Sequence, residues 1–163
     1  MAQRRYGFST PLGGAGGIVD LAPYEINTFI NEEETGKMKH GYGVIAGSVP
    51  GTNVVRPTVG TTADKFLGVV VNNRTTELDL EGGLHIKKNA ALGVMRYGRI
   101  YVRLAGDAEP TFGDAVYLIV SGDNAGCFTN SADGNVAVKA KFVGGVDAHG
   151  AVAPIELYNQ AQA

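Results

Sequence analysis

The sequence is poor in the residue types that catalytic, redox and metal sites require. It has no tryptophan, one cysteine (Cys127) and three histidines in 163 residues. A single cysteine excludes an intrachain disulfide, which fits folding in a reducing cytoplasm. His40, His85 and His149 are far apart, and none stands in a pattern that pairs it with Ser, Cys or Asp. We therefore expect no enzyme activity, no cofactor and no metal site, and we expect Cys127 to be a small buried apolar residue.

The chain also has no excess of one charge and no long apolar run. Its 14 basic and 16 acidic residues give a formal net charge of −2, which offers no electrostatic basis for binding nucleic acid or anionic membrane. No apolar run approaches the ~18 residues that a membrane span requires. Arg4 and Arg5 are not followed by the apolar segment of ~7–15 residues typical of a signal peptide. We expect neither nucleic acid nor membrane as a partner.

Glycine, by contrast, is abundant, with 24 residues, and it marks a change of character along the chain. Residues 1–25 contain two prolines and the glycine-rich run 13–17, without helical or strand periodicity, and therefore predict an extended N-terminal arm. The run lacks the preceding strand and the Lys-Ser/Thr pair of a phosphate-binding loop, so it predicts a hinge. We interpret the arm as a docking segment, with a disordered terminus as the alternative. The candidate contact residues are Arg4, Arg5, Tyr6, Phe8, Ile18 and Val19.

Residues 26–158 predict a compact domain of short β-strands, and residues 159–163 a flexible polar tail. Residues 66–71 form a continuous apolar run, which is typical of a strand buried on both faces. Residues 24–31 predict a strand, with a short amphipathic helix as the alternative. The other expected strands are 42–46, 54–55, 84–86, 99–104, 115–120, one starting near 127, 135–143 and 155–157. Eight or so short strands with frequent turn residues predict an all-β fold, a β-barrel or a β-sandwich.

Two of these segments carry charged faces. One alternates basic and aromatic residues with apolar ones, so that a basic face lies opposite an apolar face. The other alternates acidic residues, whose repulsion favours solvent or a basic partner. We interpret the two faces as a candidate contact between neighbouring copies, with two solvated faces as the alternative. The basic face consists of Arg99, Tyr101 and Arg103. The acidic face consists of Glu77, Asp79 and Glu81.

The order of strands and glycines in several segments is similar to that of a known family. The segments are 20–34, 68–76, 93–100, 112–117 and 153–159. They resemble the structural cement proteins of tailed bacteriophages, which are also called head decoration proteins. The resemblance implies a small β-rich domain on the outer surface of the icosahedral head, commonly a trimer, that clamps adjacent major capsid subunits. An N-terminal arm of such proteins often pairs with a strand of the capsid protein.

The arm supports this interpretation independently, because an arm that orders on contact can add a strand to an exposed sheet edge. Three arms on one trimer would act together through effective concentration. We expect a non-enzymatic virion protein on the outer capsid surface, made in the host bacterial cytoplasm. Its expected partners are the major capsid protein and further copies of itself, as a homotrimer. The alternatives are a head–tail connector or tail-tube protein and, disfavoured by the lack of tryptophan, a carbohydrate-binding β-sandwich module.

Overall fold

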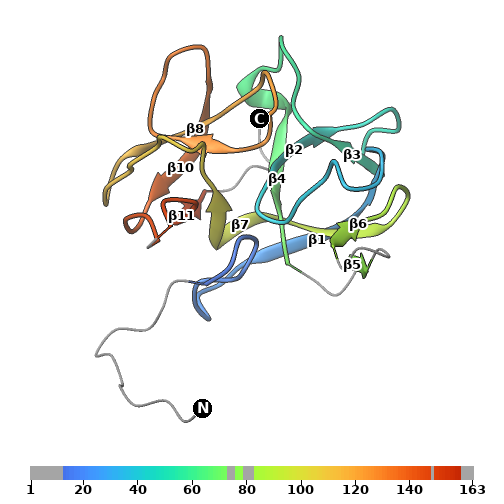
Figure 1. Cartoon of the computed structure of the whole chain (residues 1–163), viewed down its shortest axis with the longest axis horizontal. Coiled ribbons are helices and arrows are strands. Elements are labelled where there is room, and N and C mark those ends of the chain that lie inside the picture. Colours follow the sequence, from blue (N-terminus) through green and yellow to red (C-terminus); the bar gives the residue numbers. More distant parts are fainter. Residues whose placement is uncertain (1–12, 73–75, 79–82, 148, 159–163) are drawn as a thin grey trace.

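A computed structural model describes residues 13–72, 76–78, 83–147 and 149–158. These residues form strands and one short 3-10 helix, η1 (Ala63–Lys65), and therefore confirm the expected all-β fold (Figure 1). The strands are β1 (Glu25–Asn31), β2 (Gly43–Ala46), β3 (Asn53–Val55), β4 (Phe66–Val70), β5 (Thr76–Leu78), β6 (Leu84–Ile86), β7 (Ala91–Arg103), β8 (Ala115–Leu118), β9 (Phe128–Thr129), β10 (Val136–Phe142) and β11 (Val152–Leu157). In the part of the chain described, no helix has the length and apolar character to cross a membrane.

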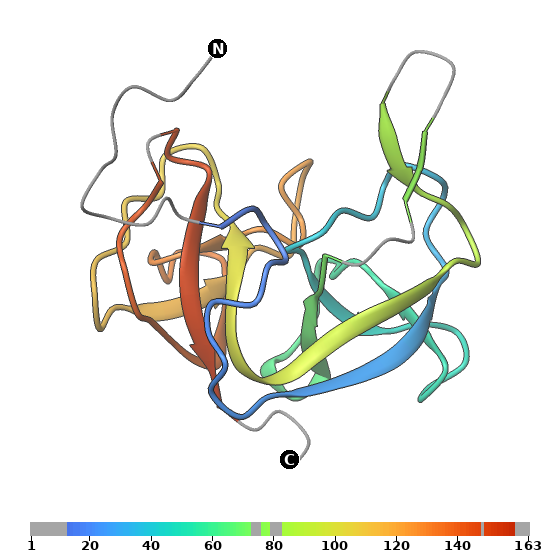
Figure 2. The same ribbon diagram turned by 90° about the horizontal axis from the view of Figure 1, so that it is seen from below.

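One sheet of nine strands has the order β1-β3-β2-β4-β7-β11-β10-β8-β9. β1 also pairs with β7, so that β1, β3, β2, β4 and β7 close into a barrel. We call this barrel the first half of the body, and the strands β8–β11 with the end of β7 the second half. Figure 2 shows the long, curved β7 running between the two halves. β5 and β6 form a separate hairpin beside the barrel.

β7 belongs to both halves because it changes neighbours near Gly98. Residues 91–97 pair with β1 and residues 98–103 pair with β11. Gly98 has a φ of +119°, a conformation that side chains rarely adopt. A Cβ at this position would also lie 2.6 Å from the Cβ of Tyr24. Glycine therefore permits both the bend of β7 and the close passage of the N-terminal segment.

The hydrophobic core covers both faces of β4 and β7. Val69 and Met95 belong to one cluster of buried side chains, which extends through the second half. Val70 and Val94, their neighbours in the two strands, belong to a second cluster inside the first half. All four are 0% exposed, and because successive strand residues point to opposite faces, both strands are buried on both sides. This confirms the expectation for residues 66–71.

Most of the other expected strands are present within a few residues of their predicted ends. Residues 25–31 form β1, so the alternative helix is wrong. β7 is the largest difference, since only its last part, near residues 99–104, was expected. The missed part contains Gly93 and Gly98, which interrupt the apolar alternation by which strands are recognised.

Candidate interaction surface

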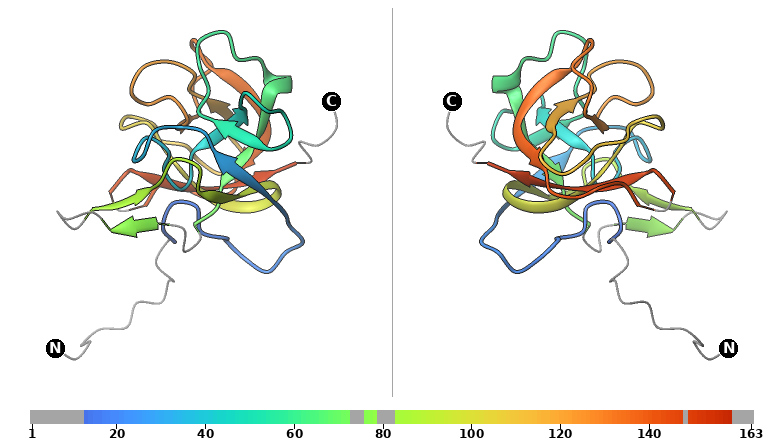
Figure 3. Two further views of the ribbon diagram at one scale, coloured as in Figure 1. Left: turned by 90° about the vertical axis from the view of Figure 1, so that its right-hand side faces the viewer. Right: turned by 90° about the vertical axis from the view of Figure 1, so that its left-hand side faces the viewer.

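Residues 13–24 lie against β7 and connect the N-terminal end of the chain to β1 (Figure 3). The amide of Gly16 donates to the carbonyl of Tyr101 at 2.7 Å, and the amide of Tyr101 donates to the carbonyl of Gly17 at 2.9 Å. Ile18 then lies opposite Ile100 in an antiparallel bridge. Main-chain hydrogen bonds therefore add a short strand-like segment to β7. At Gly16 and Gly17 the structure shows sheet-like pairing where the sequence predicted a hinge.

Glycine at position 16 is required by this arrangement. Gly16 has a φ of +79°, and a Cβ there would lie 2.7 Å from the backbone nitrogen of Asn72 and 2.9 Å from the carbonyl oxygen of Val70. The amide of Asn72 donates to the carbonyl of Gly16 at 2.8 Å, which joins the segment to the end of β4. Gly14, by contrast, has nothing within 4 Å of its Cβ position. The run of small residues thus contains closely packed positions, of which Gly16 also has a positive φ, and one position, Gly14, in open space.

A structured turn follows at residues 20–22 and holds one apolar side chain in solvent. A carboxylate oxygen of Asp20 accepts a hydrogen bond from the amide of Ala22 at 3.0 Å. The other oxygen forms an ion pair with Arg99 at 3.0 Å, and Arg99 also lies 3.5 Å from a carboxylate oxygen of Glu156. Between these anchored residues, the side chain of Leu21 is 98% exposed. The turn is tied to β7, yet its largest apolar group contacts none of the body.

Further large apolar side chains are exposed close to Leu21 in the chain or at the bend of β7. Ile18 is 37% exposed, Tyr24 is 48% exposed, and Tyr97, next to Gly98, is 40% exposed. We call Ile18, Leu21, Tyr24 and Tyr97 the N-terminal apolar surface. Single exposed apolar residues are common, but a concentration of them in one short region is typical of an interaction site.

The structure describes only part of the predicted arm. Arg4, Arg5, Tyr6 and Phe8 lie outside the described residues, so their role as contacts stays a prediction. The other two candidates, Ile18 and Val19, are in the segment on β7, and the amide of Val19 donates to the carbonyl of Arg99 at 3.1 Å. Sequence analysis missed Leu21 and Tyr24 as candidates. The sequence pattern that could have indicated Leu21 is Asp20 two residues before Ala22, because an Asp side chain often accepts a hydrogen bond from the amide two residues later in a turn. Leu21 is the apolar residue between them.

The predicted basic face is largely engaged within the chain. Arg99 pairs with Asp20 and Glu156, as described above. The ring of Tyr101 packs against Gly13, and a Cβ on Gly13 would lie 2.6 Å from this ring. Arg103 donates from Nε to the carbonyl oxygen of His40 at 2.9 Å. These contacts leave all three side chains half-buried.

Of the predicted acidic face, only Glu77 lies in the described part of the chain. It is in β5, opposite His85 of β6 in the backbone register. Asp79 and Glu81 lie outside the described residues. Contact between the acidic face of one copy and the basic face of another therefore stays a prediction.

The described residues contain no metal-binding cluster. Within that part of the chain, no three His, Cys, Asp or Glu residues are close enough to hold a metal ion together. Cys127 is buried beside Tyr42, and burial raises the pKa of its thiol. A thiol with a raised pKa is a poor nucleophile near neutral pH. Cys127 is therefore a packed core residue, as expected.

A family model described as "Structural cement protein (E217 gp24/Pam3 gp6)" matches residues 2–158. The chain belongs to the phage structural cement protein family. The match includes residues 2–12, so the N-terminal arm of this cement protein is part of the family's sequence pattern. The family establishes the cement protein as a structural component of the phage capsid.

The fold of the cement protein is also found in a solved structure. A chain in the structure titled "The capsid of Myoviridae Phage XM1" superposes with a TM-score of 0.72, over 96% of each chain and at 18% sequence identity. At this level of identity the likeness establishes the fold. No curated protein matches the chain at a significant level.

Proposed function

We propose that this cement protein binds the outer surface of the phage head through its arm and its N-terminal apolar surface. Bound there, it stabilises contacts between major capsid protein subunits, without catalysis. The observation that carries the proposal is the combination of a fixed backbone and exposed apolar side chains in residues 16–24. The main chain of residues 16–19 is hydrogen-bonded to β7 and Asp20 is paired with Arg99, while Leu21 is 98% exposed.

Such a segment is suited to binding because part of its ordering cost is met within the folded chain. Fixing one residue of backbone costs about 1–2 kcal/mol, and each residue already paired with β7 avoids that cost when a partner binds. A preformed turn that presents an apolar side chain is the arrangement of an interface anchor, which fills a pocket on the partner. Residues 1–12 directly precede this anchored segment in the chain, and we expect them to contact the same capsid subunit as Leu21.

The binding test mixes the purified chain with undecorated heads of its phage and measures the co-sedimenting protein. We expect saturable binding at a fixed ratio to the major capsid protein. Deletion of residues 1–12 should reduce the affinity strongly while the body remains folded. Absence of binding to heads, together with assembly into rings or tubes, would instead favour a component of the neck or tail.

A matched pair of variants tests whether Leu21 itself contacts the head, or whether a charge at any exposed apolar position weakens binding. Leu21→Asp should weaken head binding by about tenfold or more, as expected for an interface anchor. Val59→Asp is the control, since Val59 is 81% exposed and its loop, between β3 and η1, lies at the opposite end of Figure 1 from residues 13–24. Equal binding by both variants would remove Leu21 from the interface.

We further propose that the protein acts as a homotrimer, in which three arms engage the head together. Linked binding sites raise the apparent affinity by about 10²–10⁴-fold without any new contact. Light scattering should give the mass of three chains, in solution or after release from heads. Reversing the sign at Arg103 should weaken the trimer if the predicted acidic and basic faces form its interface. A monomer that binds heads in single copies would contradict the trimer.

A further inference from the structure

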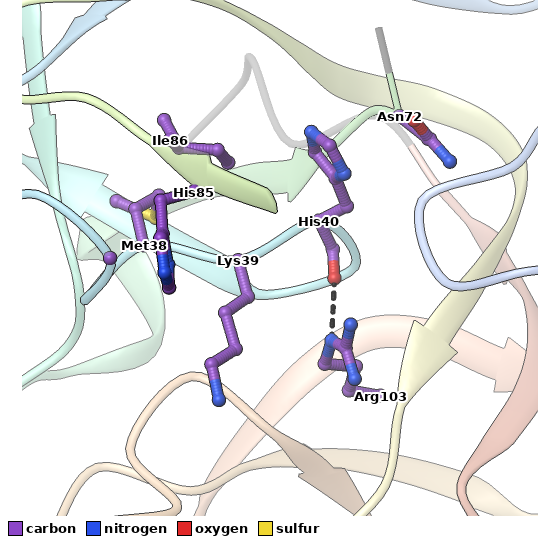
Figure 4. A pocket seen from close by; sticks show the side chains of 8 residues that line it. Met38, Lys39, His40, Asn72, His85, Ile86 and Arg103 are labelled. Carbon is purple, nitrogen blue, oxygen red and sulfur yellow. Dashed lines mark hydrogen bonds between the residues drawn. The ribbon is translucent and has the colours of Figure 1, made fainter. Parts of the chain in front are cut away.

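A pocket of about 490 Å³ lies beside the N-terminal segment, between the loop that precedes β2, the end of β4, β6 and the end of β7 (Figure 4). The segment touches one wall of it, because a Cβ at Gly41 would lie 2.9 Å from the Cβ of Ala15. A Cβ at Gly16 would likewise lie 3.0 Å from the Cβ of His40. The lining includes Met38, Lys39, His40, His85, Ile86 and Arg103.

The polar part of the lining carries positive charge without a compensating acid. Lys39 and Arg103 are its two cations, and none of the lining residues is Asp or Glu. Arg103 is oriented by the hydrogen bond from its Nε to the carbonyl oxygen of His40. Among the described residues, neither cation forms an ion pair with a carboxylate. Two cations in a hollow with no acid attract an anionic group.

His40 adds a hydrogen-bonding group to which the described part of the chain offers no partner. Its Nε2 is buried and has no hydrogen-bond partner among the described residues. Burial first, and the charge of Arg103 second, lower the pKa of His40, so the ring is neutral at pH 7. A buried polar atom without a partner is destabilising, and a ligand that hydrogen-bonds to it would recover part of that cost.

The other lining residues add no acid. Met38 and Ile86, which are 1% and 2% exposed, are covered core side chains at the base of the pocket and leave the two cations as its main binding groups. A carboxylate matches them, because the guanidinium of Arg103 can bind one through two parallel hydrogen bonds. A glutamate side chain carries its carboxylate on two methylene groups, which lets it reach into a hollow from a neighbouring backbone.

We propose that this pocket binds the side chain of a glutamate of the major capsid protein. The inference rests on the proposed function for the identity of the partner. The capsid is the source because the pocket lies next to Ala15 and Gly16 of the segment that the proposed function places on the capsid. The contact fixes the position of the bound capsid segment relative to the body, while the apolar surface contributes buried area.

The first test examines the pocket chemistry with the chain alone. The probe is N-acetylglutamate N-methylamide, which carries one side-chain carboxylate and no backbone charge, and the control probe is the corresponding glutamine compound. We expect the glutamate probe to shift the NMR signals of the His40 and His85 rings saturably at millimolar concentration, whereas the glutamine probe leaves them in place. Unmoved rings, or equal shifts with both probes, would overturn the proposal.

A pair of lysines provides the matched variants for this titration. Lys39 lines the pocket, whereas Lys37 is exposed two residues away and does not line it. Lys39→Gln should weaken probe binding by about fivefold, the factor expected for removal of one solvent-accessible ion pair. Lys37→Gln should bind the probe as the unmodified chain does. Equal affinity of the two variants would remove Lys39 from the site.

The second test places the same pair on the phage head. Lys39→Glu should reduce head binding, with Lys37→Glu close to the unmodified protein. If the unmodified protein binds heads and the two variants bind equally well, the pocket proposal fails while the proposed function stands. If the unmodified protein does not bind heads, the proposed function fails, and with it the capsid as source. Self-association that Lys39→Glu abolishes, with unchanged head binding, would make a second copy the occupant and overturn the capsid assignment.

Discussion

Ile18 and Ile100 are the same residue type in directly opposed positions, yet the structure uses them differently. Ile100 is 0% exposed in the core of the second half, whereas Ile18 is 37% exposed on the segment paired with it. This part of β7 is held by Ile100 and Val102 packed in the core, and residues 16–19 are held mainly by main-chain hydrogen bonds. The comparison shows that backbone hydrogen bonds can attach the segment to β7 without burying its apolar side chains, which remain exposed for a partner.

The largest expected effect comes from truncating the buried member of this pair. Ile100→Ala should lower the free energy of unfolding by about 2–5 kcal/mol, because it removes buried methyl groups and leaves a cavity. Ile18→Ala should lower it by less than about 1 kcal/mol, since part of the side chain is already in water. Urea denaturation of both variants measures the two values. Similar losses would show that the segment is as much a part of the core as β7 is.

The sequence allowed the strands of the body to be predicted because their side chains carry the pattern. The run at residues 66–71 and the alternation at residues 99–104 are determined by burial, which acts on residue type. The attachment of residues 16–19 leaves no such pattern, since its hydrogen bonds come from the backbone and its close contacts require glycine. The contact role predicted for the arm side chains therefore stays a prediction, and the sequence could not locate the point where the N-terminal segment meets the body.

The same reasoning explains why the candidate pocket was not predicted. Its lining residues come from four separate parts of the chain, and Lys39, His40 and Arg103 are unremarkable in their local sequence. They are brought together by the closure of the barrel and by the path of the N-terminal segment. Long-range register, which decides both, is set by the packing of the whole sheet and not by any short motif.

The next effect concerns the segment itself. Gly16→Ala should destabilise the protein by about 1–3 kcal/mol, because alanine is strained at a φ of +79° and would press on Asn72 and Val70. Gly14→Ala is the matched control, since its Cβ position has nothing within 4 Å. Thermal unfolding measures the loss, and hydrogen exchange at the amide of Tyr101 reports whether the segment has detached. An unchanged exchange rate in Gly16→Ala would show that the attachment tolerates a side chain.

A smaller effect is expected where the turn at residues 20–22 is tied to β7. Arg99→Gln removes the ion pairs with Asp20 and Glu156, which lie at the surface and so contribute little to the stability of the whole protein. It should instead speed hydrogen exchange at the amide of Ala22 and weaken head binding through Leu21, since a looser turn must be ordered when the partner binds. Lys88→Gln, which removes the exposed pair with Glu34, is the control. A lower melting temperature without faster exchange at Ala22 would place the role of Arg99 in the body and not in the turn.

The smallest effect is a dependence on pH at the contact between the pocket and the segment. The pKa of His40 is lowered from its ordinary value of 6.5, first by burial and then by the charge of Arg103. The unfolded chain therefore takes up a proton at this ring more readily than the folded protein does, and the free energy of unfolding should fall as the pH drops below about 6.5. The pKa values of Asp114 and Asp147 are lowered from 3.8, so these carboxylates affect stability only in a more acidic range.

Urea titrations at pH 7.5 and pH 5.5, about one unit either side of the ordinary pKa of histidine, measure this effect. The free energy of unfolding should fall between the two pH values in the unmodified protein and in His149→Gln, and should fall less in His40→Gln. An equal loss in all three would assign the pH dependence to groups other than His40, and would leave the contact between its loop and Gly16 indifferent to protonation.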